Sequence, residues 1–580
     1  MKVVFFIGSD SEPTRRAIES VCGLPNVRPV AALLDTAPAG LKRRFRNLRR
    51  NIRREGPTYL VLRPLRGLRR LSDGLVASAV VSRDEVSKVL QAAFPERSFS
   101  LSQLADRHGF AVLKVGNLNG ASAIAACKSL DADLGIVIGT RILARKIFSV
   151  PRMGCINLHK GKVPEYRGMP PGFWELYDGA PSAGVTVHFV DDGLDTGDVI
   201  GASEIPIRPT DTLESLQEKL HAEGSRLLAA AVQSLQAGTA VRTPQPSGGN
   251  KPRTKPTTAQ VRELRQRLPH WRQPGDFATV IKNAYALAVY RLGIFRLSRL
   301  AHSFARQRAC VLLYHRVNDY SKDPLTVDTG TFAGHLLAIS RWYQSISTTE
   351  LVGRIRQRER IEPTAVAVHF DDCYRDVASN AQPILEALKY PAAAFISSGF
   401  IDTDRVFDHD ARKNPFPYEN LRGSDIRAWA GGGFEVGAHT VNHVDLGGCG
   451  DEEAALEVLT SRTQLAAVIS GDEAASGGGG DSGALRNTVR YFSFPFGGIR
   501  NIRSEVVRMI HEAGYSALFA AHGGFVDGNA DLYDLPRIGV SFRHSPLFLL
   551  LELEGLMPNQ ILAKLKRVLG RGANPGHPAA

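Results

Sequence analysis

The sequence predicts an α/β protein with more than one domain. Its 580 residues exceed the roughly 100–200 residues of one ordinary domain. Hydrophobic residues make up 43% and charged residues 22%, so the chain can build folded cores. In its first part, short apolar runs such as VVFFIG, PVAALLD and ADLGIVIG alternate with helical patterns such as PTRRAIESVC. This alternation predicts a parallel sheet with helices on both faces.

Several classes of protein are excluded at this point. No run of about 18 apolar residues occurs, so we expect no membrane-spanning helix. The opening MKVVFFIGSDSE is an apolar run followed by acidic residues, which favours a first buried strand over a signal peptide. The 6 cysteines show no CxxC spacing and predict reduced thiols in a cytosolic protein.

The net charge of +14 is unevenly distributed along the chain. Residues 41–72 carry twelve Lys or Arg and one Glu, and residues 251–308 carry thirteen Lys or Arg and two acidic residues. Two interpretations remain open. The basic residues lie on solvated helix faces and a linker, or they contact an anionic partner such as a membrane face or a phosphate-linked sugar. Nucleic acid ranks lower as a partner, because no recognised nucleic-acid-binding pattern accompanies these residues.

Changes in composition predict the domain borders. The segment PQPSGGNKPRTKPTT at 244–258 indicates a linker, and strand signals begin again at CVLLYH. We therefore expect a first domain at 1–240 and a basic linker and helix at 241–307. A second domain follows at 308–545, and a C-terminal helix and tail at 546–580.

The first candidate site combines NLH with the turn GLDTGD. Asn157 and His159 are two residues apart on a predicted strand, so they point to the same face. Asp195 lies in the turn. These three residue types suit acyl transfer to an amine. The imidazole takes a proton from the attacking amine, the carboxylate stabilises the charged ring, and the amide donates to the oxyanion. From spacing alone, ordinary structural residues explain such a pattern more often.

The stretch CINLHKGKVPEYRGMPPGFWELYDGAPSAGVTVHFVDDGLDTGDVI resembles the formyltransferase family that uses 10-formyltetrahydrofolate. The shared pattern is N-x-H at a strand end, Y-R-G in the following loop, then GVT and LDTGD. The resemblance covers roughly residues 1–240. It implies a Rossmann-like parallel-sheet domain whose catalytic residues are Asn157, His159 and Asp195.

The same resemblance bears on the cofactor and the acceptor. The segment GTRILARKIFSVP is similar to the family's pterin-side loop, which implies cofactor contacts from Arg141, Ile142 and Leu143. After the histidine, GKVP at 161–164 departs from the Ser-Leu-Leu-Pro of many members. The acceptor therefore stays open among the family's substrates, which are initiator tRNA, glycinamide ribonucleotide and nucleotide-linked amino sugars.

The second candidate site combines AVAVHFDDCYRD with FEVGAHTVNH. The first segment is an apolar strand that ends in Asp371 and Asp372, and the second contributes His439 and His443. Two imidazoles and one carboxylate can hold a divalent cation and leave positions open for water and substrate. The other aspartate would serve as a base. Two surface histidines without a metal are the alternative explanation.

Together with LLYHRVND and YFSFPFGG, these motifs resemble the polysaccharide deacetylase family over roughly residues 308–545. The resemblance implies a distorted (β/α) barrel. It implies that Asp371 is the catalytic base and that Asp372, His439 and His443 bind the metal, with zinc as the expected ion.

Some residues depart from the deacetylase pattern. Cys373 stands where the family usually has Gly, and His369 replaces the usual Thr. Neither is a metal ligand in the family, and we expect Cys373 to be a buried structural thiol rather than an added ligand. The late Leu-x-His motif that supplies a general acid is not evident. His522 and His544 lie in the right region, but the acid stays unassigned.

Formyl transfer and amide hydrolysis meet at an amino sugar, because deacetylation exposes an amine and formylation caps one. The sequence predicts a bifunctional enzyme of cell-surface glycan synthesis, in the cytoplasm or at the inner face of the membrane. Its acceptor would be a nucleotide-linked or lipid-linked amino sugar, with contact to an anionic membrane surface and no nucleic acid partner. Two alternatives remain. The second domain is an inactive carbohydrate-binding module, or the chain formylates initiator tRNA without the small C-terminal barrel expected for that function.

Overall fold

A computed structural model describes residues 1–562 apart from 37–47, 50, 55, 57–58, 99, 210, 247–251, 269–275, 306–307, 322, 360, 362–364, 414–417 and 472–488. Parts of the basic stretch 41–72, of the predicted linker 244–258 and of the predicted tail 546–580 therefore lie outside the described residues. Two compact units are present. The first contains Met1–Pro64, Glu96–His270 and His409–Phe416, and the second contains Leu65–Pro95, Trp271–Asp408 and Pro417–Ala580.

The first unit is a mixed sheet in the order β3-β2-β1-β4-β5-β6-β7. Its first five strands pair in parallel, which confirms the predicted parallel sheet, while β6 and β7 run antiparallel at one edge. The strands are β1 Lys2–Ile7, β2 Arg28–Asp35, β3 Ala111–Val115, β4 Leu134–Ile138, β5 Cys155–His159, β6 Ser182–Phe189 and β7 Val199–Pro206.

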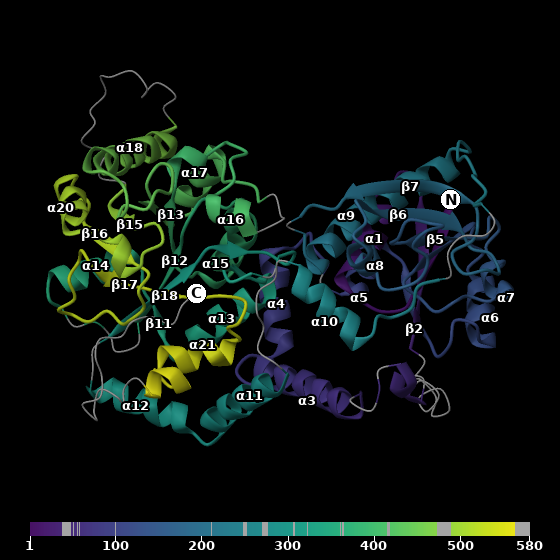
Figure 1. The fold of residues 1–580 in the computed structure, drawn as a ribbon, viewed down its shortest axis with the longest axis horizontal. Helices are drawn as coiled ribbons and strands as arrows, with labels where there is room; N and C mark the ends of the chain where they lie inside the picture. Colours follow the sequence, from purple (N-terminus) through teal and green to yellow (C-terminus); the bar gives the residue numbers. More distant parts are fainter. Residues whose placement is uncertain are drawn as a thin grey trace. The chain divides into compact units, whose positions relative to one another are not determined.

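Both faces of this sheet are covered by helices (Figure 1). On β1, Val3 and Phe5 join a core with α1, α5, α8 and α9, whereas Val4 and Phe6 join a core with α6 and α7. This alternation explains why the first strand is continuously apolar. The helices of the unit are α1 Glu12–Cys22, α5 Leu101–His108, α6 Ala121–Ser129, α7 Arg145–Phe148, α8 Phe173–Asp178, α9 Leu213–Gln236 and α10 Thr258–Arg267.

The strand order reverses direction at β1, which lies between β2 and β4. In open α/β sheets, ligands bind beyond the carboxyl ends of the strands at such a switch point. The ends of β1 and β4 approach closely, because a Cβ on Gly8 would lie 2.2 Å from the Gly139 carbonyl oxygen. The loops after β1, β4 and β5 therefore share one edge of the sheet.

The second unit is a parallel sheet in the order β17-β16-β15-β14-β13-β12-β8-β18, with β11 paired to β12. Because β17 and β18 are separated by one residue and pair with opposite ends of the sheet, the sheet nearly closes into a barrel. The predicted barrel is thus confirmed. The strands are β8 Ala309–Tyr314, β11 Gln344–Ser345, β12 Ala365–Phe370, β13 Ala393–Ile396, β14 Glu435–Ala438, β15 Tyr491–Ser493, β16 Ala517–Ala520, β17 Leu535–Pro536 and β18 Ile538–Gly539.

Alternate residues of the barrel strands fill its interior. Ala365 and Ala367 of β12 pack there with Phe395 and Phe519. A short parallel pair, β9 Arg316–Val317 and β10 Thr326–Val327, follows β8. The outer helices are α13 Thr329–Trp342, α14 Thr348–Arg356, α15 Gln382–Leu388, α17 Gly423–Gly431, α18 Asp451–Ser470, α20 Ser504–Glu512 and α21 Pro546–Leu553, and several of them ring the sheet in Figure 1. Helix α16 spans Asp408–Lys413 and from His409 onward belongs to the first unit.

Four further helices complete the second unit, and two of them come from the N-terminal part of the chain. The helices are α3 Tyr59–Ser78, α4 Arg83–Ala93, α11 Asp276–Arg291 and α12 Ile294–Ala305. Only the part of α3 from Leu65 onward belongs to this unit. Helix α4 packs against α13 and α15, and Arg341 bonds the Val80 carbonyl and the Glu85 carboxylate.

Among the helices of the described residues, none is both long enough and apolar enough to cross a membrane.

Candidate active sites

The carboxyl end of β5 carries the first group of candidate residues. Asn157 and His159 flank the buried Leu158, so both side chains lie on one face of the strand. Strand β6 runs antiparallel beside β5 and places His188 opposite Asn157. Asp195 follows β6 in a turn with a φ of 55°, in the left-handed region that non-glycine residues rarely adopt.

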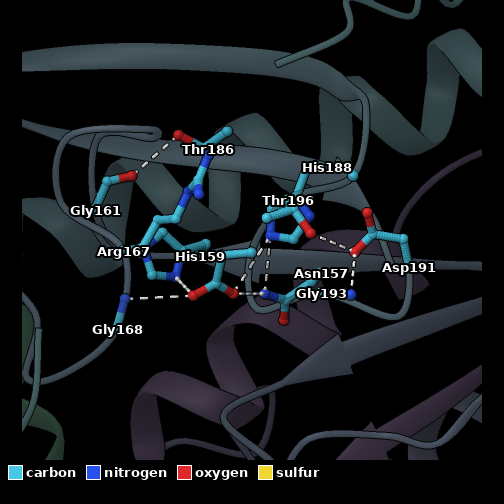
Figure 2. Close-up of polar contacts among 12 residues, drawn as sticks. Asn157, His159, Gly161, Arg167, Gly168, Thr186, His188, Asp191, Gly193 and Thr196 are labelled. Atoms are coloured by element: carbon cyan, nitrogen blue, oxygen red, sulfur yellow. Dashed lines mark hydrogen bonds and ion pairs between the residues drawn. The ribbon is translucent and has the colours of Figure 1, made fainter. Parts of the chain in front are cut away.

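Figure 2 shows Asn157, His159, His188 and the Gly168 amide directed at one central carboxylate, which belongs to Asp195. Its Oδ1 lies 3.3 Å from Asn157 Nδ2 and 3.6 Å from His188 Nε2. Its Oδ2 lies 3.5 Å from His159 Nδ1 and accepts a 3.3 Å hydrogen bond from the Gly168 amide. The structure therefore brings the three predicted residues together.

The two ring nitrogens of His159 have different surroundings. Nε2 lies 3.0 Å from the Tyr166 carbonyl oxygen, which can only accept, so Nε2 carries the hydrogen. Burial lowers the pKa of His159 below its ordinary value, although the Asp195 carboxylate opposes this effect. The ring is therefore neutral near pH 7, and Nδ1 is the atom that can take a proton. A proton there would face Asp195 Oδ2.

Asp195 remains charged in this partly enclosed position. Burial opposes its ionisation, but the neighbouring imidazoles and the hydrogen bond from the Gly168 amide hold its pKa below the ordinary value. A carboxylate beside a neutral imidazole stabilises the imidazolium that forms when the ring takes a proton. The pair is thus arranged for general base chemistry.

His188 is a site residue that the sequence analysis did not single out. Its Nδ1 donates to the Phe189 carbonyl oxygen at 2.8 Å, so Nε2 is an acceptor and lies 3.2 Å from Asn157 Nδ2. His188 therefore orients the Asn157 amide toward Asp195. The available signal was the register of VTVHF, because a strand antiparallel to NLH presents its histidine to the same face.

The predicted cofactor residues follow β4 at the same sheet edge. The Arg141 guanidinium is paired with Asp35 and donates to Asn117 Oδ1 at 3.3 Å. Ile142 is 65% exposed, whereas Leu143 is buried. The loop therefore presents the apolar Ile142 side chain to solvent, whereas the Arg141 charge is already engaged.

The carboxyl ends of β12 and β14 carry the second group of candidate residues. Asp372 Oδ1 lies 3.2 Å from His443 Nε2 and 3.6 Å from His439 Nε2. The possible ligand atoms of these three residues all lie within 4.8 Å of one another. Asp372 has a φ of 77° and His443 a φ of 56°, and these left-handed residues turn both side chains into one position.

The donor set fits a divalent cation. Two imidazole nitrogens and one carboxylate oxygen are ligands that zinc and similar metals accept, with positions left for water and substrate. His439 Nδ1 donates to the Ser493 carbonyl oxygen at 2.8 Å, which leaves Nε2 unprotonated toward the site. Asp372 is also ionised. Burial opposes this, but the neighbouring imidazoles, with His443 Nε2 at 3.2 Å, hold its pKa well below the ordinary value.

Asp371 is held by Arg537 rather than by the metal-ligating group. Arg537 donates from Nη1 to Oδ1 and from Nη2 to Oδ2, each at 2.7 Å, and Ser493 Oγ donates to Oδ2 at 2.9 Å. Burial opposes ionisation of Asp371, but the Arg537 charge holds its pKa below the ordinary value. Arg537 is the single residue between β17 and β18, where the barrel closes, and the sequence analysis did not identify it.

His315 is a further residue that the sequence analysis did not assign. The last residues of β8 and β12 pair, and the Asp371 amide donates to the Tyr314 carbonyl oxygen at 3.0 Å, so His315 follows β8 beside Asp371. Burial is the largest influence on the pKa values of Asp371 and Asp372, and His315 is among the charges that lower both. An imidazole therefore flanks both aspartates.

The two unusual residues of the HFDDC motif lie in packed surroundings. His369 is buried in the barrel between the Phe395 and Phe519 rings, and its Nε2 lies 3.1 Å from Thr348 Oγ1. Burial lowers its pKa well below the ordinary value, so the ring is neutral. Cys373 is buried, and burial raises its pKa. The potential metal-ligating group among the described residues does not include it.

The two histidines considered for the general acid have carboxylate partners of their own. His522 Nε2 lies 2.7 Å from Asp534 Oδ1, and His544 Nε2 lies 2.8 Å from Glu552 Oε2. The hydrogen bond with Asp534 raises the pKa of His522. His315 differs from both histidines, because it directly follows β8, whose last residue pairs with the last residue of β12 before Asp371.

Comparison with protein families gives two matches. The formyl transferase family model matches residues 74–232, and the polysaccharide deacetylase family model matches residues 358–476.

Curated relatives are similar to the first part of the chain. A methionyl-tRNA formyltransferase of Agathobacter rectalis is 38% identical over 141 residues, which are 24% of this chain and 46% of that protein. One of Parvibaculum lavamentivorans is 31% identical over 182 residues, which are 31% of this chain and 57% of that protein. The chain thus spans about half the length of the curated relatives it matches.

Solved structures resemble each unit at low sequence identity. A Streptococcus pyogenes deacetylase in complex with acetate is 19% identical with a TM-score of 0.34, covering 42% of this chain and 96% of that chain. A sugar N-formyltransferase from a Shewanella species is 14% identical with a TM-score of 0.28, covering 49% of this chain and 88% of that chain.

Proposed function

Residues 74–232 carry a domain of the formyl transferase family and residues 358–476 a domain of the polysaccharide deacetylase family, and from this premise we propose that the chain is a bifunctional enzyme that modifies amino sugars. One domain transfers a formyl group from 10-formyltetrahydrofolate to a sugar amine, and the other hydrolyses an N-acyl group. The observation that carries the proposal is that one chain holds both groups of reacting side chains, around Asp195 and around Asp372.

In formyl transfer, His159 is the general base. The Arg141–Leu143 loop would hold the pterin ring of the cofactor, which would supply the activated formyl group. His159 Nδ1 takes the proton that the attacking amine loses, and Asp195 stabilises the resulting imidazolium at 3.5 Å. Asn157 Nδ2 contacts His188 and Asp195, and one of its two N–H groups exchanges its present partner for the formyl oxygen as negative charge develops there.

In amide hydrolysis, Asp371 is the general base. Asp372, His439 and His443 would hold a divalent cation, which would supply Lewis-acid chemistry for the hydrolysis. Asp371, oriented by Arg537 and Ser493, takes a proton from the attacking water. When the carbon–nitrogen bond breaks, His315 donates a proton to the leaving amine. The products are a free carboxylate and a free sugar amine.

The two reactions meet at the same functional group. Hydrolysis yields a free amine, and formyl transfer requires one, so a single sugar can lose one acyl group and receive another. We place the enzyme in the cytoplasm or at the inner face of the membrane, in the synthesis of cell-surface glycans. Its acceptor is carried on a nucleotide or on a lipid, and the protein contacts an anionic membrane surface.

A second candidate function is formylation of initiator tRNA. The names of the curated relatives favour it. The similarity covers about half of those proteins, and in this chain a deacetylase-family domain follows instead. A third candidate, an inactive carbohydrate-binding deacetylase domain, is disfavoured by the grouped Asp372, His439 and His443 and by the Arg537-oriented Asp371.

The proposal is tested with the full chain, 10-formyltetrahydrofolate and zinc. The acceptors are nucleotide-linked and polyprenyl-linked amino sugars, their N-acetyl forms and initiator methionyl-tRNA, and the products are read by mass. We expect formylation of an amino sugar that is lost in His159→Asn, and release of acetate from an N-acetyl sugar that is lost in Asp372→Asn. Formylation of the tRNA alone, with no sugar product, would overturn the proposal.

A further inference from the structure

We propose that α3, α11 and α12 of the second unit form a docking surface for an anionic lipid membrane. The inference deepens the proposed function and rests on it for its purpose, because a lipid-linked acceptor is met at a membrane. Of the 20 large hydrophobic side chains that are exposed among the described residues, nine lie on α3 from Leu65 onward, on α11, on α12 or on the link between α11 and α12. Soluble monomers rarely expose apolar residues in such concentration.

Helix α11 exposes an uncharged stripe. Phe277, Ile281, Ala284 and Ala288 are exposed and recur at intervals of three or four residues, so they follow one face of the helix. Phe277 and Ile281 are 65% and 53% exposed. The opposite face packs in the unit through buried residues such as Ala286. The helix is therefore apolar on both sides, although only one side has a protein partner among the described residues.

Helix α12 continues the pattern. Ile294, Leu297 and Leu300 are 42% to 66% exposed and lie on one face, while Phe295 is fully buried on another. Leu292, in the link between α11 and α12, is also exposed. A glycine with a φ of 78° follows it and lets the chain turn between the helices.

Helix α3 contributes a third apolar face. Leu68, Leu71 and Leu75 recur at intervals of three and four residues and are exposed, whereas Val76 is buried. Asn283 of α11 donates to Ser72 Oγ at 3.0 Å and to Asp73 Oδ1 at 2.7 Å, which fixes α3 beside α11. Figure 1 draws α3, α11 and α12 along one edge of the second unit.

Cationic side chains accompany the apolar faces. Arg70, Arg291 and Arg296 are exposed, and the chain has no acidic residue between Phe277 and Ala305. Helices with apolar faces and arginines lie in the interface of anionic membranes, where the apolar side enters the boundary and the arginines approach the headgroups. A second copy of this chain fits less well, because a symmetric contact would bring the same arginines together.

The test is flotation of the full chain with phosphatidylglycerol-containing vesicles and with vesicles of phosphatidylcholine alone. We expect the wild type to float with the anionic vesicles at low salt and to lose binding steeply as salt rises. In Leu71→Ser combined with Leu297→Ser, the partition coefficient should fall about tenfold, which corresponds to about 1.4 kcal/mol. The matched control is Leu456→Ser on α18, since Leu456 and Leu297 are 67% and 66% exposed, and it should bind as the wild type does.

A second set of variants tests the contribution of the positive charges. Arg70→Gln combined with Arg291→Gln should weaken binding to anionic vesicles, whereas Arg508→Gln on α20, an exposed arginine of the same unit, should not. All variants should keep both activities on a water-soluble amino sugar.

Several outcomes would overturn the proposal of a docking surface. They are wild-type protein that never floats, equal binding to neutral vesicles, equal loss in Leu456→Ser, and a dimer in sedimentation that the Leu71 and Leu297 substitutions dissociate. The activities are measured without vesicles. An active enzyme that does not float contradicts the docking surface alone, and a floating protein without sugar products contradicts the proposed function alone.

Discussion

His159 lies between a carbonyl oxygen and a carboxylate, and this asymmetry decides which of its nitrogens can act as a base. The Tyr166 carbonyl fixes the hydrogen on Nε2, and Asp195 Oδ2 faces Nδ1. Replacing His159 with Asn should lower formyl transfer about 10²–10⁴-fold, the usual contribution of a general base. Acetate release should be unchanged. His108→Asn, at the end of α5 in the same unit, is the control and should keep full formyl transfer.

The pH dependence of formyl transfer follows from the burial of the same ring. Burial lowers the pKa of His159 below its ordinary value of 6.5, so the neutral base persists into mildly acidic solution. The profile of kcat/KM, corrected for ionisation of the acceptor amine, should fall on the acid side with a midpoint below pH 6.5. A midpoint above 6.5 would mean that the base is solvated or is a different group.

Substitution should distinguish the roles of Asp371 and Asp372. Asp371→Asn removes the base and should abolish acetate release while zinc still binds with one ion per chain. Asp372→Asn removes a ligand and should lower zinc affinity. Zinc content is measured by metal analysis after gel filtration. Loss of zinc in Asp371→Asn, with retention in Asp372→Asn, would show that the two roles are reversed.

Arg537 pairs with a carboxylate that is almost fully buried, so its removal leaves an uncompensated charge. Arg537→Gln should lower the free energy of unfolding of the second unit by about 3–5 kcal/mol. The exposed Arg508→Gln should change it by less than about 0.5 kcal/mol. Denaturant unfolding followed through zinc release measures both. Equal stability of the two variants would contradict the importance of the Arg537–Asp371 pair.

At the residue level, the sequence predicted residues that belong to motifs and missed those that support them. Asn157, His159 and Asp195 come together, as do Asp372, His439 and His443. Arg537 was missed because its partner is 166 residues away in the chain and only closure of the barrel brings the two together. His188 and His315 required strand register, which hydrophobic patterning does not supply.

At the level of elements, α4 shows how sequence order and packing can diverge. It lies within the residues that match the formyl transferase family, yet it packs against α13 and α15 of the second unit. Leu90 is its buried apolar anchor. Leu90→Ala should destabilise the second unit by about 2–5 kcal/mol and leave the unfolding of the first unit unchanged. If the first unit were destabilised instead, the assignment of α4 would be wrong.

The elements themselves were predicted unevenly. The apolar runs VVFFIG and ADLGIVIG became β1 and β4, because strands covered on both faces are continuously apolar. The reversed direction of β6, which makes its pairing with β5 and with β7 antiparallel, was not predicted, since alternation of residues does not encode strand direction. The packing of α4 depends on contacts with residues more than 200 positions later, which local patterns cannot reveal.

For the whole molecule, the central claim is that two chemistries on one chain act on the same amine. The chain matches two family models and folds into two compact units, whereas a substrate shared by both activities is a proposal. The predicted borders at 240 and 308 also stay predictions. The most informative experiment therefore follows a single sugar through both reactions.

That measurement is incubation of the zinc-loaded full chain with one N-acetyl amino sugar and isotope-labelled 10-formyltetrahydrofolate, read by mass over time. Our account predicts a free amine first and then the labelled N-formyl sugar. Asp372→Asn should give neither product, and His159→Asn should stop at the free amine. Formylation of no sugar, or hydrolysis and formylation confined to different sugars throughout the panel, would contradict the claim.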